Sequence, residues 1–377
     1  MKRKKRIVAT TQCLSCGSWV CIARILNSLA DRGYEVTVVS LGEKPTDPGR
    51  FKYISIPFLR YDRFGNITCY HPLLSLLWIF PLFVVGMLVS LIQRPVGLVV
   101  NGVTTGFSMA PFARLLGIKT LVMDHTTLKS TGGRMLAILK KLGTYVDYVV
   151  ANSTGSYHDI SAVVDSSKVI VNDHYADSMF FEDFKKDVSR KGPLVISYVG
   201  RIDWDKLCFP FLDAIEVFGN RKDVSFRLAG TGSDIGKAIK LAETYDNVEW
   251  LGFLKGRDEV KQIFTDSDVV WSGGDVTYLT LPAVEALACG APIVIPEYAI
   301  VVPNNRKIDT NLVPKEIGWL VDTMDNKAVE KLLLWLIENK EVPRGMRLTC
   351  HNYAKKHYSS TNLISTIDAL EKVMLDK

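Results

Sequence analysis

The stretch "LVISYVGRIDWDKL", residues 194–207, decides the fold class. Its first half is an apolar, β-branched run, which is typical of a buried strand in a parallel sheet. A glycine and a charged turn follow, and a helix-length segment begins after them. This strand–loop–helix pattern predicts a βαβ unit with its loop at the carboxyl end of a strand.

Two cations occupy that loop, Arg201 and Lys206, five residues apart. Ligands of open α/β sheets bind at the carboxyl ends of the strands. A forked guanidinium beside an ammonium suits a diphosphate whose charge grows as a bond to it breaks. The alternative is a pair of solvated loop charges, each neutralised by Asp203 or Asp205.

The same alternation of strands and helices runs through the whole chain. Apolar runs predict strands at 6–10, 35–40, 53–57, 97–101, 120–124 and 148–152, and again at 194–200, 225–230, 248–252, 268–273 and 292–297. The charged stretch 182–192 separates the two sets and is interpreted as a linker. We therefore predict an α/β protein with two doubly wound, Rossmann-like domains facing an interdomain cleft.

The amino-acid composition excludes several classes of protein. The 377 residues are 47% hydrophobic with a net charge of +6, which describes a globular chain without the basic density of a nucleic-acid-binding protein. Seven cysteines, an odd number, suit a reducing compartment. Cys13 and Cys16 form a lone C-x-x-C, so a redox pair is an alternative hypothesis, whereas a zinc site would need a second ligand pair. No metal site is expected.

Residues 71–93 contain no Asp, Glu, Lys or Arg. Their length permits a membrane span, but strands of one sheet precede and follow the segment, so a single crossing is disfavoured. Pro81 and Gly86 also allow two shorter helical pieces. We favour contact with a membrane surface over a buried core helix, and a span comes third. The basic run 2–6 is either a frayed end or a second point of attraction to anionic lipid.

Two more segments in the second half of the chain contain candidate binding residues: a glycine-rich loop and the start of a helix that contains Glu285. Gly230, Gly232 and Gly236 in "FRLAGTGSDIG" (226–236) permit a close backbone approach to a phosphate, although the spacing misses that of the dinucleotide motif. Glu285 lies in the first turns of a helix within 272–297. Its carboxylate either accepts hydrogen bonds from a vicinal diol or simply matches the helix dipole.

The ordered motifs "VGRIDWDK", "RLAGTGSDIGKAIKLAE", "VEWLGFL" and "LPAVEALACGAPIVI" resemble the donor half of the retaining glycosyltransferases of family 4, which have the GT-B fold. The first half is similar more loosely, in "GYEVTVVS", "FSMAPFARLLGIKTLVMDHTT" and "YVVANSTGSYHDI". The tail resembles the terminal helix that crosses back to the first domain. The implied organisation is an acceptor-binding domain at 1–181, a linker at 182–192, a nucleotide-sugar donor domain at 193–345 and a returning helix at 346–377.

The resemblance assigns roles to individual residues. Arg201 and Lys206 would hold the donor diphosphate and stabilise the departing nucleotide, and Glu285 would bind the ribose. The remaining implied donor contacts would be made by Gly17 near the diphosphate, by Phe253 and Leu254 at the base, by Thr280 and Leu281 at the phosphates, and by His125 beside the sugar. Gly230 and Gly232 are predicted donor-binding residues from their own position between a strand and a helix. For His125 the alternative is a satisfied histidine at a strand end.

The sequence departs from the family pattern at a position that is expected to contact the donor sugar. The family has a second Glu eight positions before the ribose-binding one, and here that position is Thr277. Asp275 is the nearest candidate to substitute for it. Leu207 replaces the glycine that usually follows the diphosphate lysine. These changes leave the identity of the donor open.

The sequence thus predicts a hexosyltransferase that uses a nucleotide diphosphate sugar of UDP or GDP type and no cofactor. The resemblance implies retention of configuration. We expect a lipid-linked or envelope-glycan acceptor, no nucleic-acid partner and a peripheral position on the cytoplasmic face of a membrane. A catalytically idle nucleotide-sugar-binding subunit and a nucleotide-sugar epimerase are the alternatives.

Overall fold

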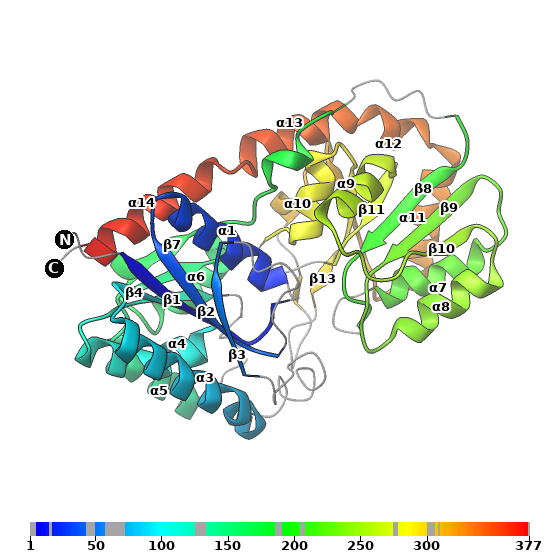
Figure 1. Cartoon of the computed structure of the whole chain (residues 1–377). Coiled ribbons are helices and arrows are strands. Elements are labelled where there is room, and N and C mark those ends of the chain that lie inside the picture. Colours follow the sequence, from blue (N-terminus) through cyan, green and yellow to red (C-terminus); the bar gives the residue numbers. More distant parts are fainter. Residues whose placement is uncertain are drawn as a thin grey trace. The chain divides into compact units, whose positions relative to one another are not determined.

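The computed structural model describes residues 5–14, 17–42, 50–56, 72–124, 133–184, 191–203, 208–273, 278–299, 306–307 and 310–375. The chain divides into two compact units, coloured along the sequence in Figure 1. Unit 1 comprises Met1–Asp173 and Thr361–Lys377, and unit 2 comprises His174–Ser360. Each unit has its own parallel sheet and its own core.

Unit 1 is built on a seven-stranded sheet in the order β3-β2-β1-β4-β5-β6-β7. Its strands are β1 (Arg6–Thr11), β2 (Glu35–Leu41), β3 (Lys52–Ile56), β4 (Gly97–Asn101), β5 (Lys119–Asp124), β6 (Tyr148–Ala151) and β7 (Val169–Val171). Neighbouring strands are parallel throughout. Their near-continuous apolar runs follow from this, because helices cover both faces of a parallel sheet.

Two sets of helices cover this sheet. The helices are α1 (Gly17–Asp31), α3 (Pro72–Gln93), α4 (Val103–Leu115), α5 (Gly133–Gly143), α6 (Thr154–Ser161) and α14 (Thr361–Leu375). The side chains of α1 and α14 share one core with β1, β2 and β4, whereas those of α3 and α4 pack with the alternate residues of the same strands. Figure 1 shows α3, α4 and α5 together on the second face. As the sequence predicts, α1 ends before Gly33, which has φ +88°.

α3 is one continuous helix with Pro81 inside it, so the two shorter pieces that the sequence allowed do not form. Gly86 explains how the helix packs. A Cβ there would lie 2.9 Å from the Met109 side chain and 2.9 Å from that of Thr10, so only glycine permits this approach to α4 and β1. Among the described residues, no helix combines the length and the apolar character needed to cross a membrane.

α14 belongs to unit 1, so the end of the chain returns to the first domain as predicted. The return starts at Thr361 and not at residue 346, because Arg347–His357 form a separate helix in unit 2. Glu371 on α14 accepts hydrogen bonds from Lys5 at 3.3 Å, Arg32 at 2.9 Å and Tyr34 at 3.1 Å. These contacts lower the pKa of Glu371, the Arg32 hydrogen bond most. Burial, helped by Glu371, raises the pKa of Tyr34. The chain's last helix is therefore fixed to the first βα unit.

Unit 2 contains a six-stranded parallel sheet in the order β10-β9-β8-β11-β12-β15. Its strands are β8 (Leu194–Val199), β9 (Val224–Ala229), β10 (Val248–Trp250), β11 (Val269–Trp271), β12 (Ile293–Pro296) and β15 (Gly318–Val321); β13 (Tyr298–Ala299) and β14 (Arg306–Lys307) form a small antiparallel pair. The helices are α7 (Phe209–Val217), α8 (Ile235–Thr244), α9 (Arg257–Asp266), α10 (Leu281–Ala288), α11 (Asn326–Glu338), α12 (Glu341–Gly345) and α13 (Arg347–His357).

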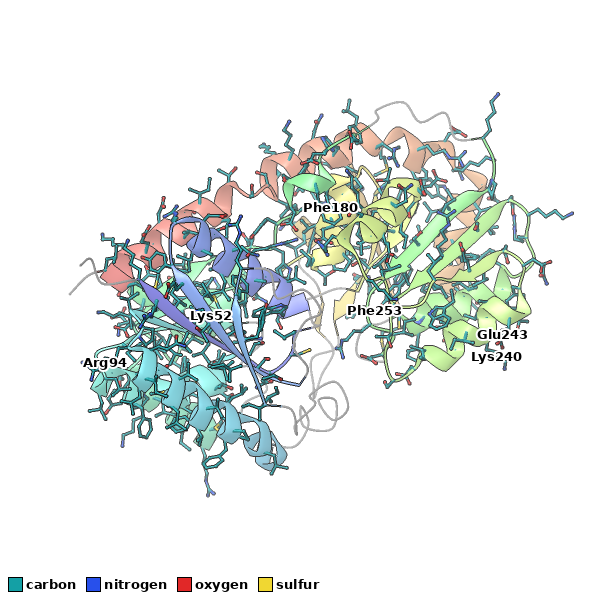
Figure 2. The ribbon with its side chains drawn as sticks, viewed as in Figure 1. Lys52, Arg94, Phe180, Lys240, Glu243 and Phe253 are labelled. Carbon is teal, nitrogen blue, oxygen red and sulfur yellow. The ribbon has the colours of Figure 1, made fainter. Side chains whose placement is uncertain are left out.

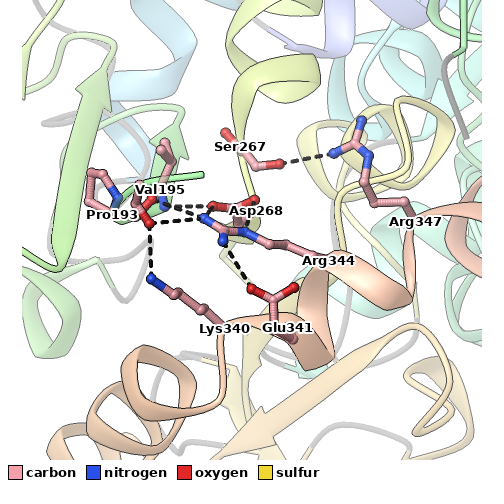
Figure 3. Close-up of polar contacts among 9 residues, drawn as sticks. Pro193, Val195, Ser267, Asp268, Lys340, Glu341, Arg344 and Arg347 are labelled. Carbon is pink, nitrogen blue, oxygen red and sulfur yellow. Dashed lines mark hydrogen bonds and ion pairs between the residues drawn. The ribbon is translucent and has the colours of Figure 1, made fainter. Parts of the chain in front are cut away.

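The amino ends of β8 and β11 are fixed by buried charges (Figure 3). The Asp268 carboxylate accepts a hydrogen bond from the Val195 N–H at 3.0 Å and two from Arg344, both at 3.2 Å. Arg344 also donates to the Pro193 carbonyl at 3.1 Å. These contacts hold the two central strands in register at their amino ends. The loops at their carboxyl ends carry none of these structural contacts and are the place to look for a binding site.

Candidate functional site

The candidate site lies at the carboxyl end of β8. This strand pairs with β9 on one side and with β11 on the other, so the order of strands along the chain reverses at β8. The carboxyl ends of β8 and β11 are therefore the topological switch point of the sheet, which is the usual ligand position in a doubly wound fold. Arg201 follows β8, and α10 with Glu285 follows β11.

Arg201 is held at the mouth of the β8 loop by a buried carboxylate. Its Nη1 lies 2.6 Å from Oδ2 of Asp203, and the side chains are 46% and 4% exposed respectively. The other oxygen of Asp203 accepts hydrogen bonds from the Ser233 N–H at 2.7 Å and the Ser233 hydroxyl at 2.9 Å. The pairing with Asp203 that the sequence offered as an alternative is present, yet it leaves nearly half of the arginine exposed.

Gly230 and Gly232 allow two loops to touch. Gly230 has φ +135°, and a Cβ on it would lie 1.8 Å from the carbonyl oxygen of Gly200. A Cβ on Gly232 would lie 2.3 Å from the Ile202 carbonyl oxygen. The Ile202 N–H donates to the Thr231 carbonyl at 3.0 Å. These glycines thus have a packing role within unit 2, and a role toward phosphate stays a prediction.

Two buried polar side chains hold the backbone of the β8 loop. The Tyr198 hydroxyl donates to the Arg201 carbonyl at 2.5 Å, and the Cys208 thiol donates to the Asp203 carbonyl at 3.5 Å. Burial raises the pKa of both groups, that of Cys208 to about 12. Both are therefore neutral hydrogen-bond donors at neutral pH, and neither is an activated nucleophile.

Glu285 is almost fully buried in α10 and forms an ion pair with Arg257, the first residue of α9. Arg257 also lies 3.8 Å from Asp177 and stacks over the Phe180 ring at 4.8 Å; Figure 2 labels Phe180. Arg257 was not predicted from the sequence, because its partner Glu285 is far along the chain. The only signal was an arginine at the start of the helix after β10.

The start of α10 is tied to the end of β11. Thr280 is the N-cap residue, and its hydroxyl lies 2.8 Å from that of Ser272 and donates to the Gly273 carbonyl at 3.3 Å. Leu281 follows as a buried first residue of the helix. These hydrogen bonds join the two ends of the loop between β11 and α10. Asp275 and Thr277, which belong to this loop, lie outside the described residues.

Phe253 and Leu254 follow β10, where Phe253 is exposed and Leu254 is half-buried (Figure 2). Glu259 of α9 accepts a hydrogen bond from the Lys255 N–H at 2.8 Å and so fixes the end of this loop. The ring of Phe253 is therefore accessible to solvent.

Of the remaining predicted residues, the structure describes some and not others. Gly17 is the first residue of α1. Lys206, Leu207 and His125 lie outside the described residues, His125 directly after β5. Cys13 is described, and Cys16 is not. Within the described residues, no cluster of three or more His, Cys, Asp or Glu side chains is placed to hold a metal ion.

The two parallel sheets, with the final helix returning to the first unit, define the GT-B fold of glycosyltransferases. Two family models match the chain: "Glycosyltransferase Family 4" over residues 16–172, and "Glycosyl transferases group 1" over residues 179–357. Together they span both units. The chain is a glycosyltransferase and belongs to the family 4 type that these models describe.

Solved structures share the complete fold at low identity. HepE of Anabaena, in complex with UDP and glucose, is 14% identical with a TM-score of 0.72, covering 98% of this chain and 99% of its own. Sucrose-phosphate synthase from Thermosynechococcus elongatus is 13% identical with a TM-score of 0.73, covering 98% of each chain. WaaG, a glycosyltransferase involved in lipopolysaccharide biosynthesis, is 11% identical with a TM-score of 0.66, covering 96% and 99%. No curated protein sequence matches the chain.

Proposed function

We propose that this glycosyltransferase moves a hexose from a nucleotide diphosphate sugar to an acceptor hydroxyl with retention of configuration. The observation that carries the proposal is Arg201. Its side chain is about half exposed at the carboxyl end of β8, and its guanidinium is paired with the buried Asp203. A positioned cation of this kind stabilises the charge that develops on a departing diphosphate. The complexes of HepE with UDP and with UDP-glucose support a UDP-type donor, and a GDP-type donor is the other candidate.

In this proposal different residues bind different parts of the donor. Arg201 and Lys206 neutralise the diphosphate, so the leaving group needs no metal ion or cofactor. Glu285 binds the ribose diol while Arg257 forms an ion pair with its carboxylate and orients it. The remaining donor contacts come from the backbone at Thr280 and Leu281, from the loop with Phe253 and Leu254, from Asp275 in place of the acid missing at Thr277, and from His125 and Gly17 as the resemblance implies.

The proposed acceptor is a lipid-linked or envelope glycan, reached from the cytoplasmic face of a membrane. The uninterrupted apolar sequence of α3 supports a peripheral position, because a helix whose sequence is apolar all round needs more cover than one sheet face provides. The described role of WaaG in lipopolysaccharide biosynthesis is in keeping with such an acceptor.

The donor site is tested by thermal shift of the purified protein against UDP, GDP, ADP and their hexose conjugates. A ligand at one hundred times its dissociation constant stabilises the folded state by about 2.7 kcal/mol. We expect one base to give a clear shift that is lost in Arg201→Ala and in Glu285→Ala. Arg221→Ala is the matched control, because Arg221 precedes β9 at the opposite ends of the strands and pairs with Asp223.

The outcomes separate the candidate functions. No shift with any nucleotide contradicts the donor site. A shift without sugar transfer to acceptors in a lipid extract favours the idle subunit. Conversion of the nucleotide-sugar in the absence of an acceptor favours the epimerase.

A further inference from the structure

α3 presents an apolar stripe to solvent. Leu82 and Val89 are buried on the side that packs against the sheet and α4. On the other side the large apolar residues are exposed, with Phe80 at 67% and Ile92 at 79%. The exposed members of the stripe are Leu77, Phe80, Leu88, Leu91 and Ile92. Spacings of three, four, eight and eleven residues place them along one side of the helix.

The stripe continues onto the two neighbouring helices. The Phe83 ring of α3 contacts the Phe112 ring of α4 edge to face, with centroids 5.0 Å apart. α4 in turn packs against α5. We define the α3–α5 surface by its exposed apolar side chains: the five residues of the stripe, Phe112, Leu115 and Leu116 at the end of α4, and Met135 and Ile138 on α5. Leu115 is 83% exposed.

The exposed charges carried by α4 and α5, and by the residue that follows α3, are of one sign. Residues 71–146 contain a single acidic residue, Asp124, which is fully buried and accepts a hydrogen bond from Ser156. The exposed charges that the structure describes there are all basic: Arg94, Arg114, Arg134, Lys140 and Lys141. Figure 2 shows Arg94 just beyond the end of α3. Helices that combine exposed apolar side chains with exposed cations, and that carry no exposed acid themselves, are complementary to anionic headgroups above an apolar layer. Glu35 of β2, which lines a pocket together with Ile92, is paired with Arg6.

We infer that the α3–α5 surface docks the protein on an anionic lipid bilayer, with Phe80, Leu115 and Ile138 entering the headgroup region and the cations contacting lipid phosphates. A second copy of the chain fits this surface less well, because two such faces would bring like charges together. The inference deepens the proposed function and rests on its peripheral location. It also extends the contact from residues 71–93 to α4 and α5.

The charge part of the inference is tested by flotation of the full chain with vesicles of phosphatidylcholine, with and without phosphatidylglycerol. We expect the protein to float with the anionic vesicles and to be released as salt rises. Lys140→Glu with Lys141→Glu should weaken binding about thirtyfold or more. The matched control is Lys355→Glu with Lys356→Glu, another exposed lysine pair in the last turn of a helix, in unit 2.

The apolar part is tested by a triple variant, Phe80→Gln, Leu115→Gln and Ile138→Gln. It should lose flotation, whereas glutamine at the similarly exposed Val217 and Met324 of unit 2 should not. Absence of wild-type flotation, or equal losses in the control variants, overturns the inference. A dimer in light scattering that the triple variant abolishes assigns the surface to a second copy instead. The variants should keep the nucleotide-induced thermal shift, so a failure of lipid binding is distinguishable from a failure of the donor site.

Discussion

Arg257 forms an ion pair with the carboxylate of Glu285, which is buried in the helix after β11. We predict that Arg257→Leu destabilises the protein by about 1 to 3 kcal/mol, because the buried acid loses its charged partner. The cost is below that of a fully buried pair, since the Arg257 side chain is 35% exposed. Urea unfolding measures the stability, and titration with the preferred nucleotide measures the accompanying loss of affinity.

The matched control is Arg227→Leu. Arg227 also pairs with two carboxylates, Glu249 at 3.6 Å and Asp266 at 3.7 Å, but both acids are well exposed. A surface pair of this kind contributes less than about 1 kcal/mol. Equal losses in the two variants, or an unchanged nucleotide affinity in Arg257→Leu, would contradict the positioning role.

The Arg257–Glu285 pair also illustrates what the sequence could not predict. Most strands were predicted, because apolar β-branched runs between turn residues are a local signal that reports burial in a parallel sheet. β7, β13, β14 and β15 were missed. β7 and β15 lie at the edges of their sheets, and β13 and β14 have only two residues each. The partner of Glu285 depends on how the loops after β10 and β11 meet, and no spacing along the chain encodes that distance.

The glycines of the β9 loop show a second limit. The sequence predicted a close backbone approach to a phosphate from glycines between a strand and a helix. Glycines that allow close packing between two loops produce the same sequence pattern. Only the structure shows that Gly230 lies against the Gly200 carbonyl and that Gly232 lies against Ile202. Arg201 was placed correctly at the end of a strand, whereas its contact with Asp203 was one of two alternatives that local sequence could not separate.

Gly230→Ala is expected to destabilise unit 2 by at least about 1 to 3 kcal/mol, the usual cost of a strained backbone conformation. Its φ is +135°, and the added Cβ would overlap the Gly200 carbonyl oxygen. Gly236→Ala should act in the opposite direction and stabilise by about 0.5 to 1 kcal/mol, because Gly236 lies in α8 with open space around it. Urea midpoints for the two variants provide the comparison, and a shift of the same sign in both would refute the packing role.

Asp268→Ala should be the most destabilising single substitution among these, by about 3 to 5 kcal/mol. It leaves the buried guanidinium of Arg344 without its carboxylate and the Val195 N–H without its acceptor. Asp223→Ala is the control: it breaks the exposed pair with Arg221 and should cost less than about 1 kcal/mol. If Asp268→Leu combined with Arg344→Leu is no more stable than Asp268→Ala, the unpaired arginine is not the source of the loss.

His351 gives the protein a component of stability that depends on pH. Its ring stacks on Phe184 at 3.9 Å, and its Nδ1 lies 2.7 Å from the Ala288 carbonyl. Burial lowers the pKa of His351 below the ordinary value of 6.5, so the folded chain resists a proton that the unfolded chain accepts. The free energy of unfolding therefore loses this contribution as pH falls below about 6.5, and the loss ends once the folded-state pKa is passed.

His351→Gln keeps a hydrogen-bond donor toward Ala288 but cannot titrate. We expect the urea midpoint of the wild type to fall more steeply between about pH 7.5 and pH 5 than that of the variant, because the histidine pKa of about 6.5 lies within this window. The variant's own stability at pH 7.5 is the reference, so any packing loss cancels from the comparison. Parallel pH profiles for the two proteins would show that the ring of His351 is protonated as easily in the folded chain as in the unfolded one, and that its burial between Phe184 and Ala288 has no electrostatic consequence.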